Sequence, residues 1–374
     1  MDAIRTETDS PAEAKAARAG TFAKVYKVLQ DALDSRAFPG CAFGVLAGGR
    51  VALADALGNF TYDQDAPAVA VETVFDVASL TKVVATTAIA MVLFERGELH
   101  LDTPVGELLP GFVIGRPNSE LARRVTLRNL LAHNSGLPGY VEFFRREISA
   151  SGLFRACLGL PIEAEPGRRN EYSDPGFILL GKALEILNRD SLSSMARKEI
   201  FEPLGMTAAC YRPARPRWER IAPTEIDEAF RRRRIQGEVQ DENAWVLDGV
   251  AGHAGVFSNV PDLLRFAGGV LDSHSGGSGI FKRETVDLFA QRQDPEGSSQ
   301  ALGWDTPSAS ESSAGRYFSS KSIGHLGYSG CSLWIDLEAQ VAAVLLTNRT
   351  WPDRTSQAIK QVRPAFHDAV RESL

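Results

Sequence analysis

The sequence predicts an α+β fold: an antiparallel sheet built from both termini, flanked by helices, with a mostly helical subdomain inserted. Short apolar segments separated by turns lie near both ends of the chain and indicate strands. They are residues 41–46 and 51–57, around Gly48-Gly49, and residues 332–336 and 341–347. The middle of the chain instead shows helix-like patterns between Gly and Pro breaks. These are residues 127–132, 177–187, 193–201 and 261–270.

Two amphipathic helices are expected to flank the sheet. Apolar residues recur at three- and four-residue steps from Phe22 to Leu33, before Pro39-Gly40, and again from Ile359 to Val370. We therefore divide the chain into three parts. They are a polar leader (1–20), a sheet domain (21–100 plus 301–374) and an inserted, mainly helical subdomain (101–300). A cleft between two such parts is a typical small-molecule site.

Composition excludes several classes of protein. The 374 residues are 44% apolar and 24% charged, as in soluble globular proteins. A net charge of -6 argues against nucleic acid as a partner. The one basic run, Arg231 to Arg234, is flanked by acidic residues, and we expect it to form a solvated, locally neutralised loop.

The spacing of the cysteines and the polar N-terminal segment indicate the cellular compartment. Four widely spaced cysteines predict buried thiols in a reducing compartment: Cys41, Cys157, Cys210 and Cys331. Residues 1–20 contain no apolar signal segment, and the apolar run 83–94 is too short to cross a bilayer. We expect a cytoplasmic protein without membrane insertion, or a periplasmic one if this chain is a trimmed mature fragment. No H-E-x-x-H, Walker loop or metal-spaced Cys/His set occurs, so neither cofactor nor metal is expected.

The sharpest local motif is Ser79-Leu80-Thr81-Lys82, which follows the strand-like stretch 74–78 and opens the apolar helix. Residues three apart share a helix face, so the hydroxyl and the amine can meet. A serine nucleophile needs an adjacent base, and burial against Val83 and its neighbours is expected to lower the pKa of Lys82. Taken alone the motif is weak, because a capping Ser and an exposed Lys give the same pattern.

Two further motifs carry candidate site residues. Tyr172 lies in a loop between Pro166-Gly167 and Pro175-Gly176, where its hydroxyl can relay a proton. A half-buried Tyr bonded to backbone is the alternative. In the glycine-rich stretch 324–330, the Tyr328 amide can pair with the Ser79 amide as an oxyanion hole, although a tight turn needs no function. His133 and His253 lie in turns, where structural roles are expected.

The order of these motifs resembles penicillin-recognising serine hydrolases and serine β-lactamases. It is most similar to class C β-lactamases, D-alanyl-D-alanine carboxypeptidases of that branch and their esterase relatives. The resemblance extends from about Phe22 to the C-terminus. Supporting stretches are TLRNLLAHNSGL (126–137), YSDPGFILLG (172–181), FEPLGM (201–206), GHAGVFS (252–258) and LLTNR (345–349).

The resemblance implies a role for each matching residue. Ser79 would be the acylated nucleophile, Lys82 its activating base and Tyr172 the group that shuttles a proton to the leaving group. Asp174 stands where asparagine is usual in the family, and His325-Leu326-Gly327 stands where Lys-Thr-Gly is commoner. With Tyr328, residues Asp174, His325 and Gly327 would bind substrate.

Both departures have chemical consequences. An ionised Asp174 can only accept hydrogen bonds, so recognition of an ordinary β-lactam side chain is in doubt. His325 replaces a permanent charge with a group that titrates near pH ~6.5 when unperturbed. We therefore predict that a preference for carboxylate-bearing substrates weakens as pH rises through the His325 pKa.

The sequence thus predicts a serine hydrolase that works through an acyl-enzyme on small esters or D-amino-acid amides and peptides, with weak or no β-lactam turnover. The alternative is a catalytically silent relative that binds a ligand in the same cleft. Small ester, amide or peptide substrates are the expected partners. The sequence determines neither the physiological substrate nor the oligomeric state.

Overall fold

The computed structural model describes residues 20–116 and 119–374. The predicted leader (1–20) therefore lies almost entirely outside the described residues. A five-stranded antiparallel sheet has the order β2-β1-β10-β9-β8. Its strands are β1 (Gly40–Ala47), β2 (Arg50–Gly58), β8 (Ser322–Leu326), β9 (Ser332–Asp336) and β10 (Val341–Thr347). The predicted sheet built from the two ends of the sequence is confirmed.

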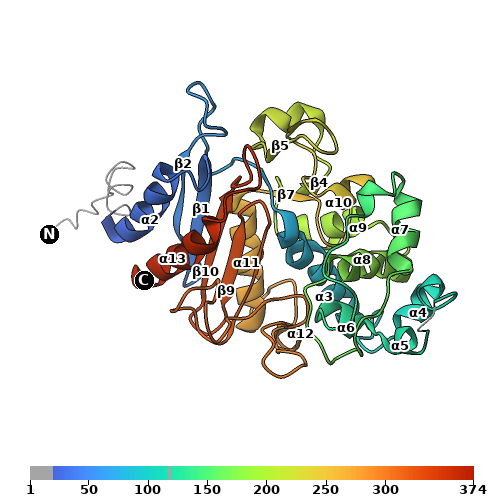
Figure 1. Ribbon diagram of the computed structural model, residues 1–374. Helices are drawn as coiled ribbons and strands as arrows, with labels where there is room; N and C mark the ends of the chain where they lie inside the picture. The colour runs from blue at the N-terminus through green and yellow to red at the C-terminus, as the bar shows by residue number, and fades with distance from the viewer. Residues whose placement is uncertain (1–19, 117–118) are drawn as a thin grey trace.

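Helices cover both faces of this sheet (Figure 1). On one face, α2 (Ala23–Asp34) and α13 (Ile359–Glu372) pack against each other and bury alternate sheet residues such as Phe43 and Leu345. On the other face, α11 (Val260–His274) contacts β1 and β10 over residues such as Ala42. Successive strand residues point to opposite faces, so each strand contributes to both layers.

The packing of α11 corrects one predicted boundary. We placed 101–300 in the inserted subdomain, yet α11, within that range, covers the sheet. Gly44 explains the close contact, because a Cβ there would lie 2.6 Å from the Val260 side chain. The amphipathic pattern of a helix shows that one face is buried but not which partner buries it.

The remaining helices gather beside the sheet, at the right of Figure 1. They are α3 (Ala88–Glu95), α4 (Val105–Leu108), α5 (Ser119–Arg124), α6 (Leu127–Leu131), α7 (Ala150–Leu158), α8 (Asp174–Asn188), α9 (Leu192–Met195), α10 (Glu242–Val246) and α12 (Arg283–Phe289). Single-turn 3₁₀ helices span Pro110–Phe112 and Phe143–Arg145, a longer one spans Arg215–Arg220, and a π-helical segment spans Ala196–Phe201. Two small sheets join this region: β3 (Phe75–Asp76), β7 (Val256–Ser258) and β4 (Cys210–Tyr211), and the pair β5 (Glu225–Asp227) and β6 (Arg233–Ile235).

The motif S-x-x-K begins a central helical segment. A 3₁₀ turn (Ala78–Leu80) leads into a π-helical stretch (Lys82–Thr87) and then α3. By length and composition, the whole segment Ala78–Glu95 could cross a membrane, but 83% of it is buried inside the structure, as in the core helix of a soluble protein. The apolar run 83–94, which we judged too short to cross a bilayer, thus lies in a longer and mostly buried helical segment.

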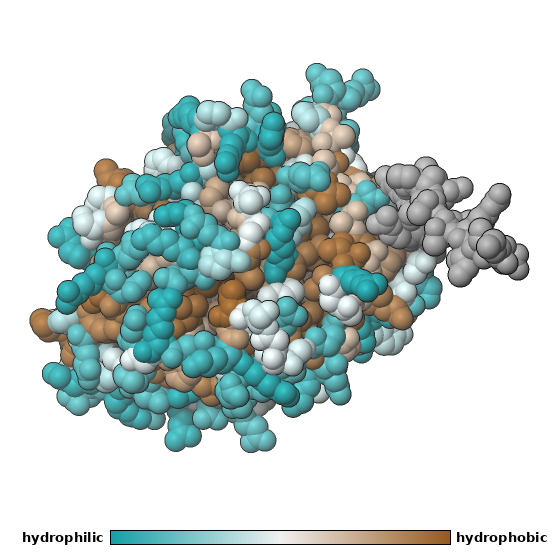
Figure 2. Space-filling view, turned by 180° about the vertical axis from the view of Figure 1, so that it is seen from behind, coloured by the Kyte–Doolittle hydropathy of each residue, from teal (hydrophilic) through white to brown (hydrophobic). Residues whose placement is uncertain are grey.

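On the face seen in Figure 2, hydrophilic side chains cover most of the molecule, and hydrophobic residues show between them mainly near the middle. Three of the four cysteines are buried as predicted, whereas Cys210 is partly exposed. All four are free thiols.

Candidate active site

Ser79 lies in the 3₁₀ turn that follows β3, and Asp76 holds this turn in place. The Asp76 carboxylate accepts hydrogen bonds from the amides of Ala78 (2.8 Å) and Gln240 (2.6 Å). Burial of this carboxyl raises its pKa to about 6. Ala78 has a φ of 48°, a left-handed conformation that is strained for a residue with a side chain. Such strain persists where surrounding contacts enforce it, and it is common at active sites.

Lys82 is completely buried and its ammonium touches three groups. Its Nζ lies 3.0 Å from Ser79 Oγ, 2.7 Å from Asp174 Oδ1 and 3.3 Å from the carbonyl oxygen of His253. Burial alone lowers the pKa of Lys82, but the negative charge of Asp174 and the nearby Tyr172 hydroxyl outweigh it and raise the pKa above its ordinary value. The predicted lowering of the Lys82 pKa was therefore wrong. Sequence spacing could not show that a carboxylate from residue 174 would pair with this amine.

Tyr172 brings its phenol to the same place. Its ring centre lies 4.6 Å from Lys82 Nζ, at a distance typical of a cation–π contact. Burial of the hydroxyl raises the pKa of Tyr172, and the charge of Lys82 and hydrogen bonding to Lys82 and Ser79 oppose this rise. The ring itself is partly open, with 39% of the residue exposed. Ser79, Lys82 and Tyr172 therefore converge as the sequence predicted.

His133 positions the loop that carries Tyr172. Its ring lies between two aromatic rings, 4.6 Å from that of Tyr172 and 4.9 Å from that of Phe177. His133 Nδ1 accepts a hydrogen bond from the Ser173 amide (2.9 Å), and its carbonyl accepts one from the Glu171 amide (2.8 Å). Burial and the charge of Lys82 hold the His133 pKa well below its usual range, so the ring is neutral. Its bonds to backbone agree with the expected structural role.

Asp174 reaches Lys82 because it begins α8. The preceding Ser173 caps this helix, accepting a hydrogen bond from the Gly176 amide at 3.1 Å. A carboxylate in the first helical turn is favoured by the positive end of the helix. Asp174 therefore contacts the proposed reactive groups directly.

The turn between β8 and β9 lies against the Ser79 segment. Ser329 Oγ donates to the Asp76 carbonyl (2.7 Å), and a Cβ on Gly327 would lie 2.5 Å from the Val77 carbonyl, so only glycine allows this approach. Gly327 therefore allows the turn between β8 and β9 to pack closely against the Ser79 segment. Within residues 20–116 and 119–374, no acceptor is hydrogen-bonded to the amide of Tyr328, and Arg349 stacks on the Tyr328 ring at 4.4 Å.

Arg363, a residue that the sequence analysis missed, holds this turn from α13. Its buried guanidinium donates to the carbonyls of Gly327, Gly330 and Cys331. Burial lowers its pKa to about 10. An arginine in an amphipathic helix gives no sequence signal that distinguishes it from an exposed one.

His325 is buried on β8, with its ring centre 5.7 Å from that of Tyr172. Its Nδ1 donates to the Leu326 carbonyl (2.8 Å). Burial and then the charge of Lys82 lower the His325 pKa to about 3. The imidazole is therefore neutral at physiological pH, and the predicted titration of His325 near pH ~6.5 was wrong because it assumed an unperturbed group.

The glycine-rich segment 252–255 contributes His253, whose backbone lies next to Lys82. Besides the carbonyl of His253, which accepts from Lys82, the His253 ring bonds to Asp241 through Nε2 at 2.9 Å. Burial opposes ionisation of Asp241, but the adjacent His253 ring and the hydrogen bonds from that ring and from the Ala244 amide outweigh it and lower the pKa of Asp241 to about 2. His253 thus both shapes its loop and contributes an acceptor to the site.

The best arranged carboxylates for a metal among the described residues are Glu225, Asp227 and Glu242. Arginines already neutralise them: Arg231 lies 2.8 Å from Asp227, and Arg354 pairs with Glu225 and, at 2.8 Å, with Glu242. The Arg231 side chain is only 2% exposed. The expectation of a wholly solvated basic run was therefore wrong for Arg231, whereas the three residues after it are exposed.

Comparison with known proteins shows the family of the chain. A model of the Beta-lactamase family matches residues 25–364. "Putative D-alanyl-D-alanine carboxypeptidase" of Escherichia coli (strain K12) is 30% identical over 305 residues, which cover 74% of this chain and 69% of that protein. "N-acetylmuramyl-L-alanine amidase" of Bacillus subtilis (strain 168) is 30% identical over 345 residues, covering 83% and 77%.

Among solved structures, "EstCE1, a hydrolase with promiscuous acyltransferase activity" superposes with a TM-score of 0.76 at 24% identity, covering 95% of this chain and 99% of that one. At this identity the likeness shows the fold. The chain belongs to the beta-lactamase family, within the serine β-lactamase and penicillin-binding-protein superfamily. The predicted family and fold class are thereby confirmed.

Proposed function

We propose that this protein is a serine hydrolase that forms an acyl-enzyme on Ser79, with small esters or D-amino-acid amides and peptides as substrates. The observation that carries the proposal is the 3.0 Å contact between Ser79 Oγ and the buried Lys82 Nζ, beside the Tyr172 phenol. A ligand-binding protein would not need a nucleophile, an amine and a phenol together.

Because Lys82 rests as an ammonium, it must lose a proton before it can accept one. The 2.7 Å hydrogen bond to Asp174 supplies a route: the Lys82 proton moves to the carboxylate, and the resulting amine takes the proton of Ser79. Ser79 Oγ then bonds to the substrate carbonyl carbon. The carbonyl π electrons move to its oxygen, and the net proton transfer is from Ser79 to Asp174.

The remaining groups complete the cycle. The amides of Ser79 and Tyr328 would donate to the oxyanion, each such donor being typically worth about 3–4 kcal/mol in the transition state. Tyr172 protonates the leaving oxygen or nitrogen as that bond breaks. It recovers a proton from Asp174 through Lys82. In deacylation, water bonds to the acyl carbon and passes a proton through Tyr172 and Lys82 to Asp174, and the same relay returns a proton to Ser79 Oγ as the ester bond breaks.

Two features favour small, uncharged esters over β-lactams. Asp174 is engaged with Lys82 and offers no hydrogen-bond donor to an acyl-amide carbonyl. The neutral His325 supplies no positive charge for a substrate carboxylate. The names of the two relatives, a carboxypeptidase and an amidase, support chemistry at an acyl carbon.

Intact-mass measurement after incubation with a fluorophosphonate tests the proposal. We expect one adduct, mapping to Ser79 and absent in Ser79→Ala. A parallel panel of nitrophenyl esters, a chromogenic cephalosporin and a D-Ala-D-Ala peptide identifies the leaving group. Adduct formation that persists in Ser79→Ala would refute the assignment of the nucleophile. A native protein that no acylating probe modifies would instead be the silent, ligand-binding relative.

A further inference from the structure

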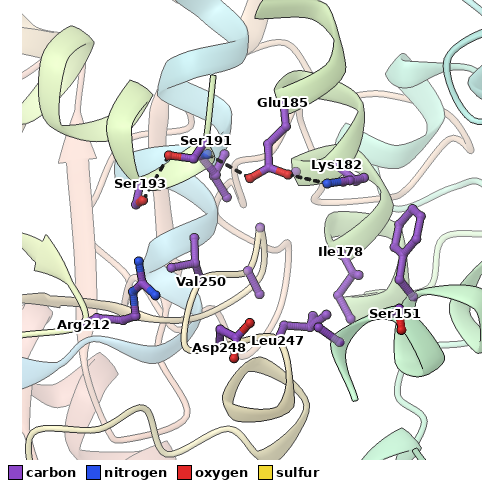
Figure 3. A pocket seen from close by; sticks show the side chains of 16 residues that line it. Ser151, Ile178, Lys182, Glu185, Ser191, Ser193, Arg212, Leu247, Asp248 and Val250 are labelled. Atoms are coloured by element: carbon purple, nitrogen blue, oxygen red, sulfur yellow. Dashed lines mark hydrogen bonds and ion pairs between the residues drawn. The ribbon is translucent and has the colours of Figure 1, made fainter. Parts of the chain in front are cut away.

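A cavity lined in part by Ile178 and Lys182 of α8 lies apart from the reactive groups (Figure 3). Its volume is about 530 Å³, within the range of small-molecule pockets, and α7, α8 and the chain after α10 form its walls. Ser79, Lys82 and Tyr172 are absent from its lining. The cavity therefore does not belong to the site described above.

The wall of the cavity combines apolar side chains with charged ones. Phe154, Ile178, Leu247 and Val250 supply apolar surface. Of the charged lining residues, Lys182 and Glu185 neutralise each other across 3.0 Å, as the dashed line in Figure 3 marks.

Arg212 and Asp248 are the other two charges. Both are exposed, and in the part of the chain that the structure describes neither side chain has an ion pair or a hydrogen bond. They lie on different segments, Arg212 directly after β4 and Asp248 after α10, and they line the same cavity. A cation and an anion that face one cavity without neutralising each other match a ligand with the opposite arrangement of charges.

We propose that this cavity binds a short apolar peptide or a related amino-acid zwitterion. Its carboxylate pairs with Arg212, its ammonium pairs with Asp248, and its apolar side chains cover Ile178, Leu247 and Val250. A planar guanidinium can bind a carboxylate through two parallel hydrogen bonds, which gives direction as well as affinity. The apolar body is held by burial of surface.

The loop after α10 carries residues of both the cavity and the proposed active site. Val250, Ala251 and Gly252 line the cavity, and the carbonyl of the next residue, His253, accepts the hydrogen bond from Lys82. An occupant would therefore contact the residues directly before the carbonyl that accepts from Lys82. This second site is independent of whether the protein hydrolyses anything.

Calorimetric titration of Ser79→Ala protein with the dipeptide Leu-Leu tests the proposal without turnover. Matched ligands are N-acetyl-Leu-Leu, which lacks the ammonium, and Leu-Leu-amide, which lacks the carboxylate. We expect each blocked ligand to bind about tenfold more weakly, because each loses one charge-assisted contact. Arg212→Gln should weaken Leu-Leu by a similar factor and leave Leu-Leu-amide unchanged. Asp248→Asn should weaken Leu-Leu and leave the acetylated form unchanged.

Two further variants locate the binding. Ser151→Trp places a large side chain at an exposed position of the cavity wall and should abolish binding. Arg50→Gln removes the same charge as Arg212→Gln, but on β2 outside the cavity, and should leave the affinity for Leu-Leu unchanged. Equal affinity for the three ligands, no detectable binding of Leu-Leu, or binding that survives Ser151→Trp would overturn the proposal. None of these readouts depends on acylation of Ser79, so failure here is distinct from failure of the proposed hydrolase activity.

Discussion

The Lys82 ammonium lies 2.7 Å from the Asp174 carboxylate and forms a partly buried ion pair with it. The same ammonium is 3.0 Å from Ser79 Oγ. This pair decides the protonation state from which any reaction starts, because it favours the charged lysine although burial opposes charge. Asp174 is therefore as central to the site as the three residues of the proposed acyl-transfer machinery.

Replacing Asp174 with asparagine should change the pH range over which kcat/KM rises. The negative charge of Asp174 raises the Lys82 pKa, so its removal lowers that pKa. Without the carboxylate that accepts the Ser79 proton, however, turnover requires that Lys82 is already neutral. We therefore expect kcat/KM of Asp174→Asn to be lower near neutral pH and to rise at higher pH than in the unaltered protein, measured with a nitrophenyl ester between pH 5 and 10.

Asp102→Asn is the matched control for this prediction. Asp102 is an exposed carboxylate paired with Arg128 at 2.7 Å, outside the site, and its loss should leave the profile unchanged. If Asp174→Asn and the unaltered protein rise over the same pH range, Asp174 does not govern the base.

His325 should not act as a pH switch. Its pKa, lowered to about 3 by burial, leaves the ring neutral at both pH 5.5 and pH 8. We expect the ratio of kcat/KM for an acidic nitrophenyl ester to that for a neutral one to stay within about twofold between these pH values, apart from titration of the substrate itself. A strong preference for the acidic ester that appears only at pH 5.5 would show that His325 becomes charged.

His133 should affect turnover by positioning Tyr172. In His133→Ala, the Ser173 amide loses its acceptor and the Tyr172 ring loses a packing partner, so we expect kcat to fall about tenfold with little change in KM. His133→Asn supplies a side-chain acceptor and should recover part of the loss. His100→Ala, which removes an exposed histidine, is the control. Equal kcat in all these proteins would exclude this positioning role.

Arg363 should stabilise the turn that carries Tyr328. Arg363→Met removes three charge-assisted hydrogen bonds, although the carbonyls of Gly327 and Cys331 each keep a backbone donor, and we expect the free energy of unfolding to fall by about 3 kcal/mol. Urea unfolding followed by circular dichroism measures this change. Lys360→Met, at an exposed position of the same helix, should alter stability by less than about 0.5 kcal/mol. Similar losses in the two variants would contradict the assigned role of Arg363.

The sequence predicted the sheet because alternating or continuous apolar segments and turn residues are local signals. It also placed Ser79 and Lys82 on one helix face, since a separation of three residues fixes their proximity once the helix forms. The roles of Tyr172, Gly327 and Tyr328 came from motif order and family resemblance. Their approach to Ser79 depends on contacts between distant segments.

By itself, the sequence determined the layered α+β architecture and the chemistry available at S-x-x-K, because both depend on periodicity and short spacing. Tertiary structure alone decided the charges: it paired Lys82 with Asp174, 92 positions away, and buried His325 so that it stays neutral. Tertiary contacts also pack α11 against the sheet and place Arg363 against the turn between β8 and β9. The physical reason is that a pKa depends on burial and nearby charges, and a helix face depends on its partner, neither of which local sequence contains.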